Sequence, residues 1–171
     1  MPRFTLPLAA ALMLMIATTA SAQAPEPRRT IDLDRFMGRW HEILRTPNDH
    51  QRDCWAASQV WSRRAPNDFS ISQTCRQGTR DGRVTTINTR ARVTDTTTNA
   101  KFEASFFAGL IRQRYWVIDV APDYSWMIAT TADGRFPALL SRSPTISAAE
   151  QTRLRNRMAE LGLPTRQLIQ R

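Results

Sequence analysis

Gly38-Arg39-Trp40-His41-Glu42-Ile43-Leu44-Arg45 is the stretch of sequence that decides the fold. It follows a short turn-like segment, residues 31–37, and opens an alternating run typical of a β-strand. Gly38 stands two residues before Trp40, and a glycine at that place lets the backbone pass close beneath a large indole. Such an arrangement can plug the floor of a small β-barrel. The triplet Gly38-Arg39-Trp40 alone is weak evidence for a barrel, so the rest of the chain has to support it.

Beyond this stretch, the pattern over residues 38–142 is one strand after another, with turn signals about every ten residues. The alternation is clearest at Phe102, Ala104 and Phe106, which share one face of a strand with polar residues between them. Eight antiparallel strands at even spacing indicate an up-and-down barrel or a sandwich. The expected strands are 38–45, 54–62, 69–76, 83–94, 101–107, 113–120, 124–130 and 136–141.

One helix is predicted after the last strand, over residues 147–161. Ser147 and Glu150 form a capping box, Leu154 and Met158 belong to one apolar stripe, and Gly162 fits the C-terminal cap. The tail, residues 166–171, could add a short edge strand. No repeat or linker indicates a second domain, so we expect residues 23–171 to form a single domain with its barrel over 38–142.

The first 22 residues have the three parts of a secretory signal peptide. A basic start at Arg3 is followed by a nearly continuous apolar run over residues 4–17 and by small residues up to Ala22. We expect cleavage after Ala22 or, alternatively, after Ala24. An uncleaved membrane anchor is the other interpretation, but the run is short for the ~20 residues that a membrane-spanning helix needs. With no cysteine at either cut, we expect an exported protein, periplasmic or secreted, without a lipid anchor.

Basic residues are in excess, because the formal net charge is +9 and Lys101 is the only lysine among 24 basic residues. This charge could indicate a partner with phosphate groups, such as nucleic acid or an anionic membrane surface. The simpler interpretation is a set of arginines spread over a solvated surface, since no basic run exceeds two residues. We expect no nucleic-acid partner and, at most, weak contact with an anionic membrane surface.

Cys54 and Cys75 are the only cysteines. An even pair in an exported chain indicates one disulfide. Cys54 opens one expected strand and Cys75 closes the next, so a hairpin between them brings the two sulfurs together at its open end. The alternative is a reactive thiol used as a nucleophile, for which the two histidines, His41 and His50, give no support.

Three segments resemble the lipocalin family, closest to its bacterial outer-membrane and apolipoprotein D-like branch. They are residues 38–43, residues 115–126 (Tyr-Trp-Val-Ile-Asp-Val-Ala-Pro-Asp-Tyr-Ser-Trp) and residues 139–147 (Leu-Leu-Ser-Arg-Ser-Pro-Thr-Ile-Ser). Relatives usually carry tyrosine in place of His41. The resemblance implies an all-β fold, an eight-stranded antiparallel up-and-down barrel open at one end, with the C-terminal helix packed outside. It also implies barrel closure by Gly38, Trp40 and Arg142, with the guanidinium stacked on the indole, which is a favourable pairing in itself.

The resemblance further implies which side chains face the interior and bind a ligand. Relatives carry tryptophan at the position of Ala138, so this chain should have a wider pocket unless Trp55 or Trp61 fills the gap. A lining that is apolar and aromatic with a few neutral polar groups suits an acyl chain, a sterol-like ring or an isoprenoid. The predicted ligand-binding residues are Gln59, Trp61, Ile71, Gln73, Thr89, Ala91, Phe102, Ala104, Phe106, Tyr115, Met127 and Ala138.

The function predicted on this basis is binding and transport or storage of a small hydrophobic ligand, such as a fatty acid or lysophospholipid, in the cell envelope. We expect no enzymatic activity, catalytic residue, metal or cofactor. Two alternatives stay open. One is a lipid-modifying enzyme of the isomerase type, for which Glu42, Tyr115 or a free Cys54 are the only candidates. The other is an envelope interaction module whose barrel is filled by its own side chains.

Overall fold

Eight strands follow one another along the chain, and each pairs antiparallel with the next. The computed structural model describes residues 23–170, and the predicted signal peptide lies outside them. The strands are β1 (Gly38–Arg45), β2 (Cys54–Ala65), β3 (Asp68–Gln77), β4 (Val84–Val93), β5 (Lys101–Phe106), β6 (Ile111–Val120), β7 (Trp126–Thr131) and β8 (Ala138–Ser141).

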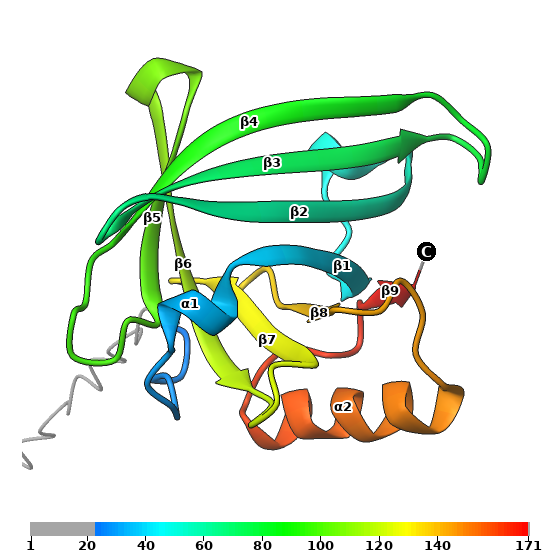
Figure 1. Ribbon diagram of the computed structural model, residues 1–171. Coiled ribbons are helices and arrows are strands. Elements are labelled where there is room, and N and C mark those ends of the chain that lie inside the picture. The colour runs from blue at the N-terminus through cyan, green and yellow to red at the C-terminus, as the bar shows by residue number, and fades with distance from the viewer. Residues whose placement is uncertain (1–22, 171) are drawn as a thin grey trace, which may run out of the picture.

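The sheet closes on itself because β1 pairs with both β8 and β2. Trp40 lies opposite Gln59 of β2, and Glu42 lies opposite Leu140 of β8. This closure distinguishes a barrel from a sandwich. The prediction of an eight-stranded up-and-down barrel is therefore confirmed (Figure 1).

A long helix, α2 (Ala148–Glu160), packs outside the barrel as expected (Figure 1). Its N-cap Ser147 accepts a hydrogen bond from the backbone N–H of Glu150 at 3.2 Å. Leu154 and Met158 are fully buried in a second core, against outward-facing residues of β1 and β6–β8. The tail adds the short strand β9 (Ile169–Gln170), which pairs with the end of β1.

Two local features depart from the expected strand boundaries. A one-turn helix, α1 (Leu33–Phe36), precedes β1 and is capped by the Asp32 carboxylate. At the other end of the barrel, β8 starts only at Ala138, because Pro137 has no N–H to donate to a ladder. The Pro137 carbonyl instead accepts a hydrogen bond from the backbone of Thr46 at 3.1 Å. Single-turn helices also follow β1 (η1, Asp49–Gln51) and β5 (η2, Phe107–Gly109).

A bulge in β1 changes which residues face the interior. The register against β8 shifts between Glu42 and Leu44. As a result Ile43 and Leu44 are both buried against the outer core beneath α2, while Arg45 lies opposite the inward-facing Ala138. The bulge therefore brings a charged side chain into the barrel that strict alternation would place outside.

The predicted disulfide is confirmed: Cys54 and Cys75 are bonded, with a Cα–Cα distance of 5.5 Å. Replacing both cysteines by serine is expected to lower the free energy of unfolding by about 3 kcal/mol, because the unfolded chain has more conformational entropy without the bond than with it. Urea denaturation of the variant and of the wild type, with and without reductant, measures the difference. Reductant should destabilise the wild type and leave the variant unchanged. Equal stability of the wild type and the variant without reductant would contradict the expectation.

Candidate binding site at the open end of the barrel

The floor of the barrel is closed by Arg142 and Trp40. The guanidinium carbon of Arg142 lies 3.7 Å from the centroid of the fully buried indole. The same guanidinium donates to the carbonyls of Arg39 (2.9 Å), Arg35 (2.6 Å) and Phe36 (3.2 Å). Since these carbonyls belong to α1 and β1, the side chain that directly follows the last barrel strand holds the first elements of the fold in place.

Gly38 makes room for this closure. Its φ of +95° is a conformation that side chains disfavour, and a Cβ there would lie 3.4 Å from Arg142 Nη1. The structure thus brings together all three residues assigned to barrel closure.

An aromatic cluster fills the lower half of the barrel. Phe36 of α1 inserts from below and stacks on Phe102, with ring centroids 5.6 Å apart. Trp61 meets both rings edge-on, each at 5.1 Å, and Phe69 completes the group. Aromatic pairs in these geometries are favourable beyond the area that they bury. The lower half is therefore a packed core.

The upper half of the barrel is open to solvent. Residues paired across a ladder point to the same side of the sheet, so the register from Trp40 onward identifies the inward face. Inward-facing side chains of the floor are at most 8% exposed, whereas Ile87 near the start of β4 is 58% exposed and Tyr115 of β6 is 36% exposed. The barrel wall still surrounds the Tyr115 phenol, and this desolvation raises its pKa above the ordinary value.

The register places all twelve predicted ligand residues on the inward face, but at two levels. Those at the lower level are buried: Trp61, Ile71, Thr89, Ala91, Phe102, Ala104 and Met127. Those at the upper level are at least partly exposed: Gln59, Gln73, Phe106, Tyr115 and Ala138. Only the second group, together with Thr89 beneath it, borders the open half.

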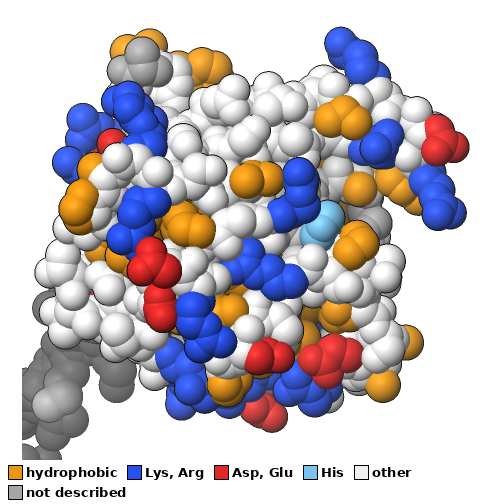
Figure 2. Space-filling model, in the orientation of Figure 1, with side chains coloured by type: hydrophobic (Ala, Val, Ile, Leu, Met, Phe, Trp, Pro, Cys, Tyr) orange, Lys and Arg blue, Asp and Glu red, His pale blue; other side chains and the backbone are white. Residues whose placement is uncertain are grey.

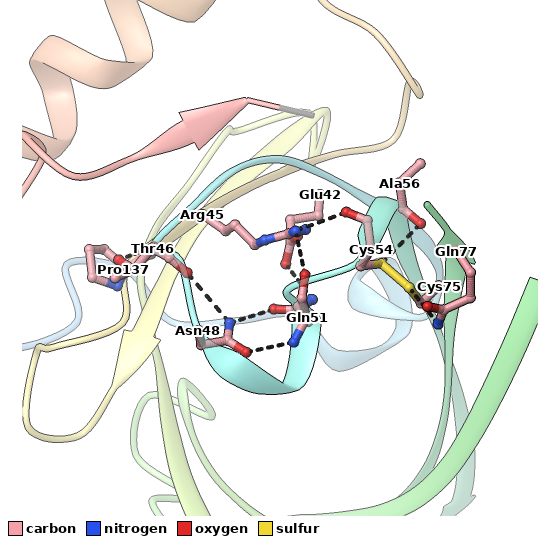
Figure 3. A network of polar contacts seen from close by, with 10 residues as sticks. All are labelled: Glu42, Arg45, Thr46, Asn48, Gln51, Cys54, Ala56, Cys75, Gln77 and Pro137. Atoms are coloured by element: carbon pink, nitrogen blue, oxygen red, sulfur yellow. Dashed lines mark hydrogen bonds and ion pairs between the residues drawn. A yellow bond between two sulfur atoms is a disulfide. The ribbon is translucent and has the colours of Figure 1, made fainter. Parts of the chain in front are cut away.

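An ion pair between the buried Arg45 and the partly buried Glu42 lies at the rim of this open half (Figure 3). Arg45 Nη1 donates to Glu42 Oε1 at 2.6 Å, and Arg45 Nη2 donates to the carbonyls of Gln51 and Cys54 at 3.0 and 2.9 Å. The second Glu42 oxygen accepts from the Gln51 amide at 3.4 Å. The two charges therefore neutralise each other, and Arg45 connects β1 to β2 where their backbone pairing has ended at His41.

The remaining polar groups of the open half are neutral. The Gln73 amide donates to the Thr89 hydroxyl at 3.3 Å, and Gln59 lies opposite Gln73 in the register. Two buried donors, Arg45 Nε and Trp61 Nε1, have no hydrogen-bond partner within residues 23–170. The open half can therefore offer a guest apolar surface and the neutral amides of Gln59 and Gln73, but no free charge at Glu42.

Two surface recesses are also present, and Arg45 borders the second of them. One, of about 520 Å³, is bordered by the ends of β7 and β8 and the first turn of α2; the other, of about 220 Å³, lies beside the loop after β1. None of the twelve predicted residues lines either recess. The described residues contain no group of three or more His, Cys, Asp or Glu side chains that could hold a metal ion. Neither helix of the described chain is long and apolar enough to cross a membrane.

Sequence reasoning missed two residues that shape the site. Arg45 was assigned no role, because only the bulge after Glu42 turns it inward. Phe36 enters the barrel through a helix of four residues, too short to show a helical period. The strongest available signal was the sequence Asp32-Leu33-Asp34, since an aspartate before an acidic first turn is typical of a helix start.

A closed eight-stranded barrel with one outer helix, a sealed floor and an open upper half defines the class of small cup-shaped barrel proteins. The chain belongs to the lipocalin family: the model of the lipocalin-like domain matches residues 31–171. A mimivirus protein (Acanthamoeba polyphaga mimivirus) named as a lipocalin is 27% identical over 130 residues, covering 73% of this chain and 75% of its own.

Solved structures show the same fold. Insecticyanin from the tobacco hornworm Manduca sexta aligns with a TM-score of 0.67 at 16% identity, over 88% of this chain and 86% of its own. Lobster apocrustacyanin A1 aligns with a TM-score of 0.62 at 13% identity, over 89% and 91%. The siderocalin Ex-FABP aligns with a TM-score of 0.54 at 16% identity, over 78% and 91%.

Proposed function

We propose that this lipocalin is a carrier that binds one small amphipathic lipid, such as a fatty acid or lysophospholipid, in the open half of its barrel. The observation that carries the proposal is the gradient of exposure along the inward face, from a sealed floor to a solvated mouth. Ile87, Phe106 and Ile111 supply apolar wall there, and binding requires only its burial by the guest. Catalysis is not part of the proposal.

Polar contacts favour an amphipathic guest over a pure hydrocarbon. The neutral amides of Gln59 and Gln73 suit a guest with polar groups that can form hydrogen bonds. The small Ala138 lies opposite Arg45, and Trp61 is packed in the floor rather than beside it. Trp55 is 42% exposed, so this tryptophan is not buried in a gap at Ala138 either.

The setting proposed for this carrier is the cell envelope. The disulfide and the family favour an exported protein, and the apolar run of residues 4–17 supports a cleavable signal peptide. We place the chain in the bacterial outer-membrane and apolipoprotein D-like branch on the three motifs around Trp40, Trp116 and Arg142. The excess of basic over acidic residues supports contact with anionic membranes.

One observation favours a second candidate function. The aromatic cluster around Phe36 fills the lower half, which is the arrangement expected of an interaction module whose barrel holds no guest. Titration with a fluorescent fatty acid distinguishes the two candidate functions.

The Ala138→Trp variant should bind a fluorescent fatty acid at least about tenfold more weakly than the wild type, because its indole occupies space that the guest needs. Fluorescence titration with cis-parinaric acid, followed by displacement with oleate, measures both affinities. Ser62→Trp is the matched control, since it adds the same indole to an exposed position on the outer face of β2. Saturable wild-type binding that Ser62→Trp retains supports the carrier. No binding by the wild type, or equal binding by both variants, would overturn it.

A further inference from the structure

The described residues expose large apolar side chains on the open half of the barrel alone. Each lies in a loop at the mouth, near the mouth end of its strand or on the inward face of the open half, whereas the closed end exposes none of this size within residues 23–170. Such a one-sided distribution on a monomer marks an interaction surface. The exposed side chains are Trp55, Val84, Ile87, Phe107, Leu110, Ile111, Tyr115 and Phe136.

The most exposed of them form the tip of the β5–β6 hairpin. Leu110 is 87% exposed and Phe107 is 69% exposed, and Ile111 follows as the first residue of β6. Phe107 has a φ of +49°, an unusual conformation for a bulky residue. The single turn η2 holds it there, with the Leu110 N–H donating to the Phe107 carbonyl at 3.3 Å. This tip stands out from the barrel at the top of Figure 1.

Four arginines lie directly beneath the tip on the outer face of the sheet, and we call them the basic grid. The register aligns Arg90 and Arg112 on either side of Ser105. It also aligns Arg92 and Arg114 on either side of Glu103, which lies two residues further from the tip along β5. Glu103 is the only acidic residue among these six, and it forms ion pairs with Arg92, Arg112 and Arg114 at 3.0, 3.4 and 3.8 Å.

The result is an apolar tip bordered by excess positive charge. Four guanidinium groups against one carboxylate leave the grid strongly cationic. Blue side chains lie next to the orange ones at the upper edge of the molecule in Figure 2. This combination matches the boundary of an anionic bilayer, where acyl chains lie just below a layer of phosphates.

We propose that the β5–β6 tip and the basic grid dock the open end of the barrel on an anionic phospholipid bilayer. Phe107 and Leu110 enter the boundary between headgroups and acyl chains, and the guanidinium groups of Arg112 and Arg114 bind lipid phosphates. The mouth then faces the membrane surface from which a lipid guest would come. In that last respect the inference rests on the proposed function, whereas docking itself requires no guest.

Two other occupants fit the same surface less well. A second copy of the chain would bring two cationic grids together in an isologous contact, where like charges repel. A nucleic acid would neutralise the grid but leave the apolar tip in water, since its backbone offers no acyl phase to receive Leu110. A bilayer satisfies both features at once.

Flotation with vesicles of phosphatidylcholine containing about one-third phosphatidylglycerol tests the proposal. Phe107→Ser/Leu110→Ser should lower the vesicle partition coefficient at least about tenfold, because two apolar side chains no longer enter the bilayer. Arg112→Gln/Arg114→Gln should also lower the partition coefficient at least about tenfold. The wild type should bind vesicles of pure phosphatidylcholine as weakly as these two variants bind the anionic vesicles. The matched control, Arg64→Gln/Arg166→Gln, removes the same charge from residues outside the tip and the grid and should retain most of the binding.

Each other outcome overturns the proposal. Wild-type protein that stays off anionic vesicles excludes docking, and a tip variant that binds like the wild type excludes the tip. A control variant as weak as the grid variant shows that net charge alone attracts the protein. If the wild type is a dimer and the tip variant is a monomer with unchanged vesicle binding, the tip forms a contact between copies of the chain instead. Thermal unfolding verifies that all variants are folded, and cis-parinaric acid titration of the same samples reports guest binding separately, so failure of docking is distinguished from failure of the carrier function.

Discussion

Replacing Trp40 by alanine is expected to lower the free energy of unfolding by about 4 kcal/mol, the upper part of the range for large-to-small changes in a core. The indole is fully buried, donates from Nε1 to the Phe36 carbonyl at 2.9 Å and carries the Arg142 guanidinium on its face. Its loss leaves a cavity between α1 and the strands, and it removes the ring that Arg142 covers. Urea denaturation followed by circular dichroism measures the difference.

Trp55→Ala is the matched control for this prediction. Trp55 is 42% exposed at the mouth, so the same chemical change should cost less than about 1 kcal/mol there. If the two alanine variants differ in stability by less than that amount, Trp40 does not hold the floor of the barrel. An Arg142→Met variant should lie between them, since it keeps the indole but loses the hydrogen bonds to three carbonyls.

Replacing Arg45 by methionine is expected to cost about 3–5 kcal/mol, because the change leaves the carboxylate of Glu42 without its partner inside the barrel. The variant also leaves the carbonyls of Gln51 and Cys54 without a donor. Chemical denaturation again measures the loss. We further expect the start of β2 to lose protection in amide hydrogen exchange, since Arg45 bridges β1 and β2 beyond the end of their pairing at His41.

The double variant Glu42→Gln/Arg45→Met separates the charge effect from the loss of the bridge. Removing both charges should restore at least half of the stability lost in Arg45→Met, because no unpaired carboxylate stays buried. Arg52→Met is the surface control: Arg52 pairs with Asp49 at 2.7 Å, but both side chains are well exposed, so a loss below about 1 kcal/mol is expected. A double variant less stable than Arg45→Met would show that an unpaired Glu42 carboxylate is not the cause of the stability lost in Arg45→Met.

The barrel could be predicted from the sequence because strand alternation and turn residues are local signals. β1 was predicted with its observed bounds, and α2 was predicted to within a residue because its cap at Ser147 and its apolar stripe are both local. The start of β8 was predicted two residues early, since a proline weakens a strand without showing in advance which residue begins it.

The candidate site was harder to predict, for a physical reason. A two-residue period determines which face of a strand a side chain occupies, but not its height along the barrel axis. Ala91 and Tyr115 therefore looked equivalent, although the first is buried in the floor and the second borders the mouth. The bulge that turns Arg45 inward depends on pairing with β8, nearly a hundred residues away, and no local pattern encodes it. The exposed tip at Leu110 was missed because exposure depends on neighbours rather than on residue type.

The hydrogen bonds from Arg142 to the carbonyls of Arg35 and Arg39 span 107 and 103 residues of chain. During synthesis the first strand thus emerges long before the side chain that locks it, and its partner β8 is also made late. The ring cannot close before β8 and Arg142 have been made. Such dependence on distant contacts slows folding, because the ends of a long loop must meet before the contacts between them can form.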